Sequence, residues 1–130
     1  MKLHHIGIAV RDIAKDPEDY QRALGIPLES RVFEDEFQRV RIRFGWIEGS
    51  VLVEFVEPIG EASPVTRWVE RGGGVYHVCY QVKNLEQEID RACRAGGILV
   101  TRPCPAPALG NKRIAFVYTR GRNLVEFLEE

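Results

Sequence analysis

The sequence predicts an α+β fold in which one β-α-β-β-β module occurs twice. The first observation is an internal repeat: residues 5–13 align with residues 77–85, and residues 52–57 align with residues 124–129 at the same offset, without a gap. The second is that the hydrophobic pattern changes from strand-like to helix-like and back in the same order in both copies. Two copies of so long a unit indicate a duplicated half-domain with a pseudo-two-fold axis rather than a solenoid.

The repeat also predicts how the chain is divided. A length of 130 residues is about one domain. We therefore predict a single domain made of two modules, at residues 1–58 and 73–130, joined by a connector at residues 59–72.

In the first module, alternating apolar residues predict a strand at residues 4–10. A helix is expected at residues 14–24, because Asp16 and Pro17 suit a first turn and Gly25 suits a helix end. Three further strands are predicted at residues 28–33, 38–46 and 50–57.

The second module follows the same order after a strand that begins near His77. Asn84 can cap a helix whose apolar face holds Leu85 and Ile89, and Gly96 can end it. The strands expected after it are residues 98–102, 111–118 and 122–128.

Two segments outside this pattern have their own signals. Val65, Trp68 and Val69 predict a short helix inside the connector. The proline-rich residues 103–107 predict an extended loop.

The amino-acid composition argues against several classes of binding partner. The 18 Lys and Arg residues nearly balance 19 Asp and Glu residues, which argues against a nucleic-acid or anionic-membrane binder. The apolar runs are too short to span a bilayer, and the start shows no signal-peptide core. Three cysteines without a CxxC spacing indicate reduced thiols. We therefore expect a cytoplasmic protein whose partner is a small molecule.

Strand alternation places a histidine and a carboxylate of each module away from the helix. His5 lies on that face of the first strand, and Glu54 lies among aliphatic residues in the last strand. His77 and Glu126 are their repeat partners, at the same spacing. Burying such a carboxylate is costly unless it is paired or binds a metal.

If the modules face each other, these four side chains converge on one divalent ion. Imidazole and carboxylate suit Co, Ni, Zn, Mn or Mg in an octahedral site with two open positions. Taken singly, each histidine is more typical of a hydrogen-bonded core residue and each glutamate of a solvated strand end. The match in both copies favours metal binding. Cys79 could add a fifth ligand, but its repeat partner is Gly7, so we expect it to line the pocket.

The chain resembles the vicinal oxygen chelate superfamily, which includes glyoxalase I, methylmalonyl-CoA epimerase, extradiol dioxygenases and fosfomycin- or bleomycin-resistance proteins. The resemblance covers nearly the whole chain and is carried by HHIGIAVRDI, LVEFVEP, YHVCYQV, KRIAF and LVEFLEE. It implies a cupped, mostly antiparallel sheet around a divalent metal, with ligands at His5, Glu54, His77 and Glu126. It also implies a homodimer, with the four ligands from one chain or from two.

Within the superfamily, the connector and the strand at residues 38–44 resemble those of methylmalonyl-CoA epimerases. This implies a metal-dependent isomerase that abstracts a proton next to the carbonyl of an acyl-CoA thioester, with Glu126 as the main base and Glu54 as its counterpart. Two features depart from that pattern. Ile42 stands where some epimerases carry a glutamate, and the turn at residues 117–122 is short.

Other activities share these features. Lactoylglutathione lyase (glyoxalase I) has the same His/Glu/His/Glu set, and a binding-only resistance protein has the same fold. An extradiol dioxygenase is a weaker alternative, because it needs two histidines and one carboxylate on iron.

Substrate contacts are predicted on the strands around the metal. Arg41 and Arg43 share a strand face and could hold a substrate carboxylate, or form salt bridges with nearby glutamates. Phe44 and Phe116 could wall the cavity or belong to the core. Further lining is expected from Cys79 and Gln81, which share the face of His77.

Overall fold

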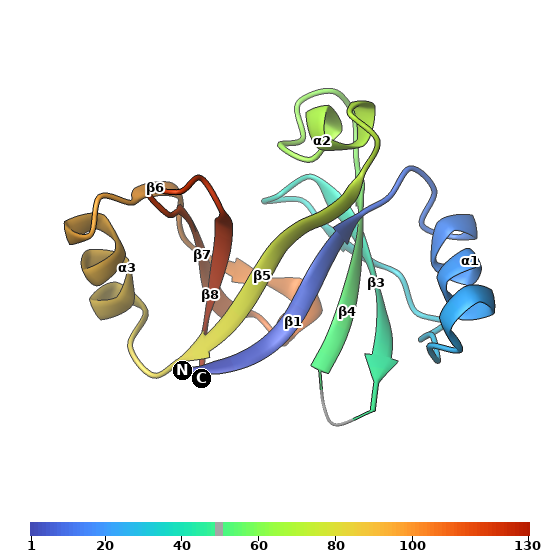
Figure 1. Cartoon of the computed structure of the whole chain (residues 1–130), viewed down its shortest axis with the longest axis horizontal. Helices are drawn as coiled ribbons and strands as arrows, with labels where there is room; N and C mark the ends of the chain where they lie inside the picture. Colours follow the sequence, from blue (N-terminus) through green and yellow to red (C-terminus); the bar gives the residue numbers. More distant parts are fainter. Residues whose placement is uncertain (49–50) are drawn as a thin grey trace. The chain divides into compact units, whose positions relative to one another are not determined.

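Each half of the chain folds into a four-stranded sheet with a helix against one face (Figure 1). The computed structural model describes residues 1–48 and 51–130 and divides into two units. One unit spans residues 5–76, and the other joins residues 77–130 to residues 1–4. Both contain the predicted βαβββ order, which confirms the α+β class. The organisation as a single domain stays a prediction.

The first module has the strand order β2-β3-β4-β1. Its first strand pairs parallel with β4, whereas the other two pairs are antiparallel. Its elements are β1 (Lys2–Ala9), α1 (Lys15–Leu24), β2 (Phe33–Asp35), β3 (Val40–Ile47) and β4 (Val51–Pro58). Gly49 and Ser50, which the repeat and the predicted strand at 50–57 include, lie outside the described residues.

The second module has the equivalent order, β5-β8-β7-β6, again with one parallel pair, β5 with β8. Its elements are β5 (Gly74–Val82), α3 (Leu85–Arg94), β6 (Ile98–Ala106), the 3-10 turn η1 (Pro107–Leu109), β7 (Lys112–Tyr118) and β8 (Leu124–Glu129). The short connector helix is confirmed as α2 (Thr66–Glu70). Among the described residues, no helix is long and apolar enough to cross a membrane.

Two predicted elements need correction. The strand expected at 28–33 is displaced to β2, and Leu28 makes only an isolated bridge to Gly45. Pro27 has no N–H to donate, although its carbonyl accepts the Trp46 N–H at 2.9 Å. The loop expected at 103–107 is instead mostly strand, because β6 continues to Ala106. Prolines are tolerated there because β6 is the outer strand of its module and its register shifts.

Helix ends follow local chemistry. The Asn84 side chain accepts the Gln87 N–H at 2.9 Å, which confirms the predicted cap of α3. Just before α1, the Asp12 carboxylate accepts the N–H groups of Ala14 and Lys15. These backbone hydrogen bonds, chiefly that from Lys15, lower the pKa of Asp12.

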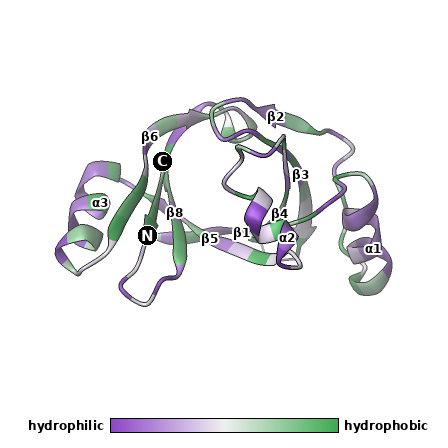
Figure 2. Ribbon diagram, turned by 90° about the horizontal axis from the view of Figure 1, so that it is seen from above, coloured by the Kyte–Doolittle hydropathy of each residue, from purple (hydrophilic) through white to green (hydrophobic). Residues whose placement is uncertain are grey.

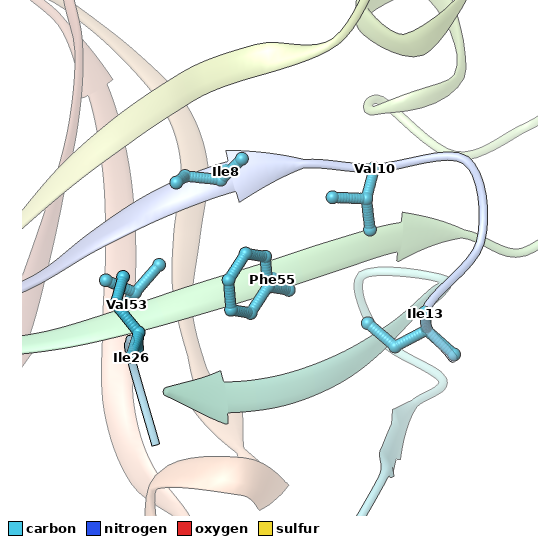
Figure 3. Packing of buried hydrophobic residues seen from close by; sticks show 6 residues of the cluster. All are labelled: Ile8, Val10, Ile13, Ile26, Val53 and Phe55. Atoms are coloured by element: carbon cyan, nitrogen blue, oxygen red, sulfur yellow. The ribbon is translucent and has the colours of Figure 1, made fainter. Parts of the chain in front are cut away.

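Each sheet packs one face against its helix. In the first module Ile8 from β1, Val10 just after it, and Val53 and Phe55 from β4 project into one cluster (Figure 3). Tyr20 of α1 adds an edge-to-face contact with Phe55, with ring centroids 5.3 Å apart. Both α1 and α3 carry hydrophilic and hydrophobic stretches (Figure 2), as expected of helices with one buried face. The other face of each sheet is therefore left for the histidines and glutamates.

Candidate metal centre

The first candidate pair lies on two neighbouring parallel strands. His5 is on β1 and Glu54 is on β4, where the register pairs Glu54 with Gly7. His5 Nε2 lies 3.3 Å from Glu54 Oε2, and both residues are buried. Because residues two apart share a sheet face, the register confirms that both lie opposite the helix-facing core.

The second module repeats this arrangement. His77 lies on β5, and Glu126 lies on β8 with Cys79 as its register partner. His77 Nε2 lies 3.0 Å from Glu126 Oε2, again between buried side chains. Gly7 and Cys79 therefore occupy equivalent positions, each directly beside a glutamate.

Each glutamate also has a phenylalanine beside it, on the antiparallel strand that neighbours its own strand. The register pairs Phe44 with Glu54 and Phe116 with Glu126. Both phenylalanines are buried, and the Phe116 ring stands nearly perpendicular to the His77 ring at a centroid distance of 5.2 Å. The predicted wall residues Phe44, Phe116 and Cys79 thus share the face of the glutamates in their own modules.

The chemistry of each pair fits a divalent cation. A buried carboxylate is expensive unless a positive charge or several hydrogen bonds compensate it. Each pair presents one imidazole nitrogen and one carboxylate oxygen close together, which are the donor types that first-row divalent ions accept. A cation can replace the proton that an imidazolium–carboxylate pair would otherwise need.

The predicted arginines lie on the opposite face of β3. Their register partners, Glu57 and Phe55, alternate with Glu54 along β4. Arg41 donates to Glu57 at 2.8 Å, and Arg43 donates to the Glu29 carbonyl at 2.7 Å. The salt-bridge interpretation describes the contacts of Arg41, while binding of substrate by either arginine stays a prediction.

The second module has an arginine, Arg113, at the position equivalent to Arg41. Arg113 donates to Glu129 and to Glu86, each at 2.7 Å. These hydrogen bonds from the Arg113 guanidinium lower the pKa of both carboxyls. Gln81, the remaining predicted lining residue, lies on β5 beyond Cys79 and pairs in register with Leu128.

One buried carboxylate had no signal that set it apart in the sequence. Asp35 at the end of β2 is fully buried and accepts two hydrogen bonds from Gln38, one from its backbone N–H and one from its side-chain amide. Both bonds hold the turn between β2 and β3. The structure therefore gives Asp35 a local structural role.

Comparison with known proteins extends these observations. Residues 4–116 match the family model described as the glyoxalase/bleomycin resistance protein/dioxygenase superfamily. A curated ethylmalonyl-CoA/methylmalonyl-CoA epimerase from Cereibacter sphaeroides is 27% identical over 94% of this chain and 91% of its own length. The uncharacterized protein YqjC from Bacillus subtilis is 32% identical over 98% of this chain and 91% of its own length.

A solved structure agrees with these matches. Methylmalonyl-CoA epimerase from Mycobacterium tuberculosis superimposes with a TM-score of 0.85 at 27% identity, over 98% of this chain and 87% of that one. The family match, the two βαβββ modules and their equivalent His–Glu pairs agree with one another. The chain therefore belongs to the glyoxalase/bleomycin resistance protein/dioxygenase superfamily.

Proposed function

We propose that this protein is a divalent-metal-dependent epimerase of acyl-CoA thioesters, acting on a substrate of the methylmalonyl-CoA class. The observation that carries the proposal is the equivalent pair of buried imidazole–carboxylate contacts, one in each module. Two of the relatives described above are epimerases of such thioesters by name, which supports the substrate class.

In this proposal, His5, Glu54, His77 and Glu126 together hold one divalent ion. The four donors supply two neutral imidazoles and two carboxylates, whose charge a divalent cation balances. When bound, the ion supplies Lewis-acid stabilisation of the negative charge that develops on the thioester carbonyl oxygen.

The protein's own residues would move the proton. Glu126 accepts the proton from the carbon next to the carbonyl, and the electron pair of that C–H bond moves into the enolate. Glu54, its repeat partner, would be protonated when this step begins and would donate that proton to the opposite face of the carbon, which inverts its configuration. Proton exchange with water would then return Glu126 and Glu54 to their starting states. One carboxylate would therefore remove the proton from one face of the carbon, and the carboxylate of the other module would supply a proton to the opposite face.

Apolar and polar neighbours complete the proposed pocket. Phe44 and Phe116 lie beside the two glutamates in register and would exclude water from the reacting carbon. Cys79 and Gln81 share the face of His77 and would line the pocket. We also propose that the protein acts as a homodimer in the cytoplasm.

The test is proton exchange at the reacting carbon. The purified chain is loaded separately with Co, Ni, Zn, Mn or Mg and incubated with methylmalonyl-CoA in deuterated water. We expect deuterium incorporation at the carbon between the two carbonyl groups, together with conversion of one epimer to the other. Turnover of a glutathione hemithioacetal without any exchange of methylmalonyl-CoA would contradict the proposal and support a lyase.

A matched pair of variants tests the assignment of the base. Glu126→Gln should abolish exchange while the circular dichroism spectrum stays that of the wild type. Glu129→Gln is the control, because Glu129 is on the same strand but bonds to Arg113 on the other face. Near-full activity of Glu126→Gln would remove Glu126 from the mechanism.

A further inference from the structure

An arginine with no distinguishing signal in the sequence lies just before β2. The guanidinium carbon of Arg31 is 4.2 Å from the centroid of the Phe33 ring, which is a cation–π contact. Arg31 is exposed, and it forms no hydrogen bond or ion pair with another residue that the structure describes. Arg41 and Arg43, by contrast, lie on the helix side of β3 and donate to protein oxygens there. Stacking on Phe33 therefore holds the Arg31 guanidinium while its N–H donors stay available to a ligand.

The register places the Phe33 side chain on the sheet face of Glu54. Phe33 pairs with Ile42 on β3, and Ile42 in turn pairs with Val56 on β4. Val56 is two residues from Glu54 on the same strand. Residues directly opposite each other, or two apart along a strand, share a face of the sheet. The guanidinium stacked on Phe33 therefore lies over the face that carries the proposed metal ligand of this module.

A second aromatic ring connects Arg31 to Glu54. The rings of Phe33 and Phe44 meet edge to face, with their centroids 6.0 Å apart. Phe44 is the register partner of Glu54, and the Cβ atoms of such a pair are typically about 5 Å apart. All four residues belong to the same unit. Two phenylalanine rings thus lie between a carboxylate and a guanidinium on one sheet face, a separation that one extended small molecule can bridge.

This arrangement determines which groups such a molecule would carry. A guanidinium binds a carboxylate through two parallel N–H donors, and an aromatic ring against its flat face leaves those donors open at its edge. The two phenylalanine rings suit an apolar substituent next to that carboxylate. A branched dicarboxylic thioester has both features, together with a carbonyl oxygen for the proposed metal.

The second module does not repeat this arrangement. At the offset of the internal repeat, Pro103 and Pro105 stand where the first module has Arg31 and Phe33. Neither proline carries a charge or an aromatic ring. An anion site at Arg31 would therefore distinguish the two modules, and a substrate with one carboxylate and one thioester would bind in a single orientation.

We propose that Arg31 binds the free carboxylate of a dicarboxylic acyl thioester and thereby determines the preference of this site for such substrates. The inference rests on the proposed function, because it assumes that the thioester carbonyl is bound beside Glu54. The carboxylate is attached to the reacting carbon, and the alkyl branch on that carbon would contact Phe44. Arg31 is in this view a specificity-determining residue that takes no part in the proton transfer.

Binding of two matched thioethers tests this assignment without turnover. S-(2-carboxypropyl)-CoA carries the carboxylate, and S-isobutyl-CoA has a methyl group in its place. Isothermal titration calorimetry with the cobalt-loaded protein measures Kd for both. We expect the wild type to bind the carboxylate analogue about 10- to 100-fold more tightly, as is typical of a charge-assisted hydrogen bond. Arg31→Met should remove most of this preference and leave the Kd of S-isobutyl-CoA unchanged. Arg22→Met is the control, because it removes the same charge from an exposed position on α1.

The outcomes separate this inference from the proposed reaction. A carboxylate preference that Arg31→Met leaves intact would overturn the assignment, as would failure of both analogues to bind. An equal loss of affinity for both analogues would also overturn it, because Arg31 would then contact the coenzyme phosphates. A preference that depends on Arg31, in a protein that exchanges no proton of methylmalonyl-CoA, would support the inference and refute the epimerase. An active epimerase with equal KM values for methylmalonyl-CoA in wild type and Arg31→Met would refute the inference alone.

Discussion

Thermal stability should rise with divalent metal if the four buried side chains hold one ion. His5, Glu54, His77 and Glu126 are each at most 4% exposed, so folding removes these four donor side chains from water. An ion that binds only the folded chain at 100 times its Kd stabilises it by about 2.7 kcal/mol. For a chain of this size, 1 kcal/mol corresponds to roughly 3–5 °C. We therefore expect Tm to rise by about 10 °C.

Removing one charged ligand should remove most of this effect. If Glu54→Gln weakens the affinity a hundredfold, the same free metal concentration contributes only about 0.4 kcal/mol, or roughly 1–2 °C. Glu57→Gln is the matched control. Glu57 is on the same strand but faces the other way, where it accepts hydrogen bonds from Ile13 N–H and Arg41. This control should lower the metal-free Tm and keep the full metal-dependent rise.

Differential scanning fluorimetry of the chelator-treated protein measures both quantities. Each variant is scanned across a titration of Co, Ni, Zn, Mn or Mg. Equal metal-dependent rises in wild type and Glu54→Gln would refute the reasoning, as would the absence of a rise with all of these ions.

Three predictions concern the scaffold, and all are checked by urea unfolding. Arg113→Leu should lower the free energy of unfolding at neutral pH. Arg113 depresses the pKa of Glu86 and Glu129 below their ordinary 4.5, so this difference should shrink as the pH falls below 4.5 and through the depressed pKa values. A difference that does not shrink on acidification would contradict the prediction. Asn84→Ala should cost about 1 kcal/mol through loss of the α3 cap, and no change would show that the cap bond contributes nothing. Phe55→Ala, at a fully buried site, should cost about 3–5 kcal/mol, and a cost below about 1 kcal/mol would contradict its central place in the core.

The face that carries the candidate ligands could be predicted from the sequence. A strand has a period of two residues, so a shift of one position would move His5 and Glu54 to the helix side. The repeat supplied a second constraint, because it matched both residues with His77 and Glu126. The alternation of residues along each strand and the internal repeat were therefore sufficient to predict that each histidine lies beside the glutamate of its own module. The Nε2–Oε2 distances of 3.3 Å in the first module and 3.0 Å in the second confirm this.

The environment of the arginines could not be predicted in the same way. Arg41 and Arg43 alternate with Val40, Ile42 and Phe44, but alternation does not say which face of a strand meets the helix. In the structure the apolar face of β3 is the face of Glu54, and the arginines lie on the other. Pairing with Glu57 across the strands, which is a tertiary contact, determines where Arg41 lies.

The outer strands were the least predictable parts of the sheets. Outer strands pair on one side only, so their limits depend on local breaks as much as on propensity. Residues 27–29 pair with β3 through a single bridge and the hydrogen bonds of Pro27 and Glu29, and the regular pairing of β2 begins only at Phe33. In β6, Pro103 and Pro105 predicted a loop, but an outer strand tolerates residues that cannot donate on its open side.

The central claim is that the two His–Glu pairs share a single divalent ion, and metal analysis of paired variants tests it most directly. The wild type and two double variants, His5→Gln with Glu54→Gln and His77→Gln with Glu126→Gln, are saturated with metal and desalted. Elemental analysis then gives the bound metal per chain. We expect one ion per chain in the wild type and none in either double variant. Two ions in the wild type, or an ion retained after either pair is removed, would contradict it.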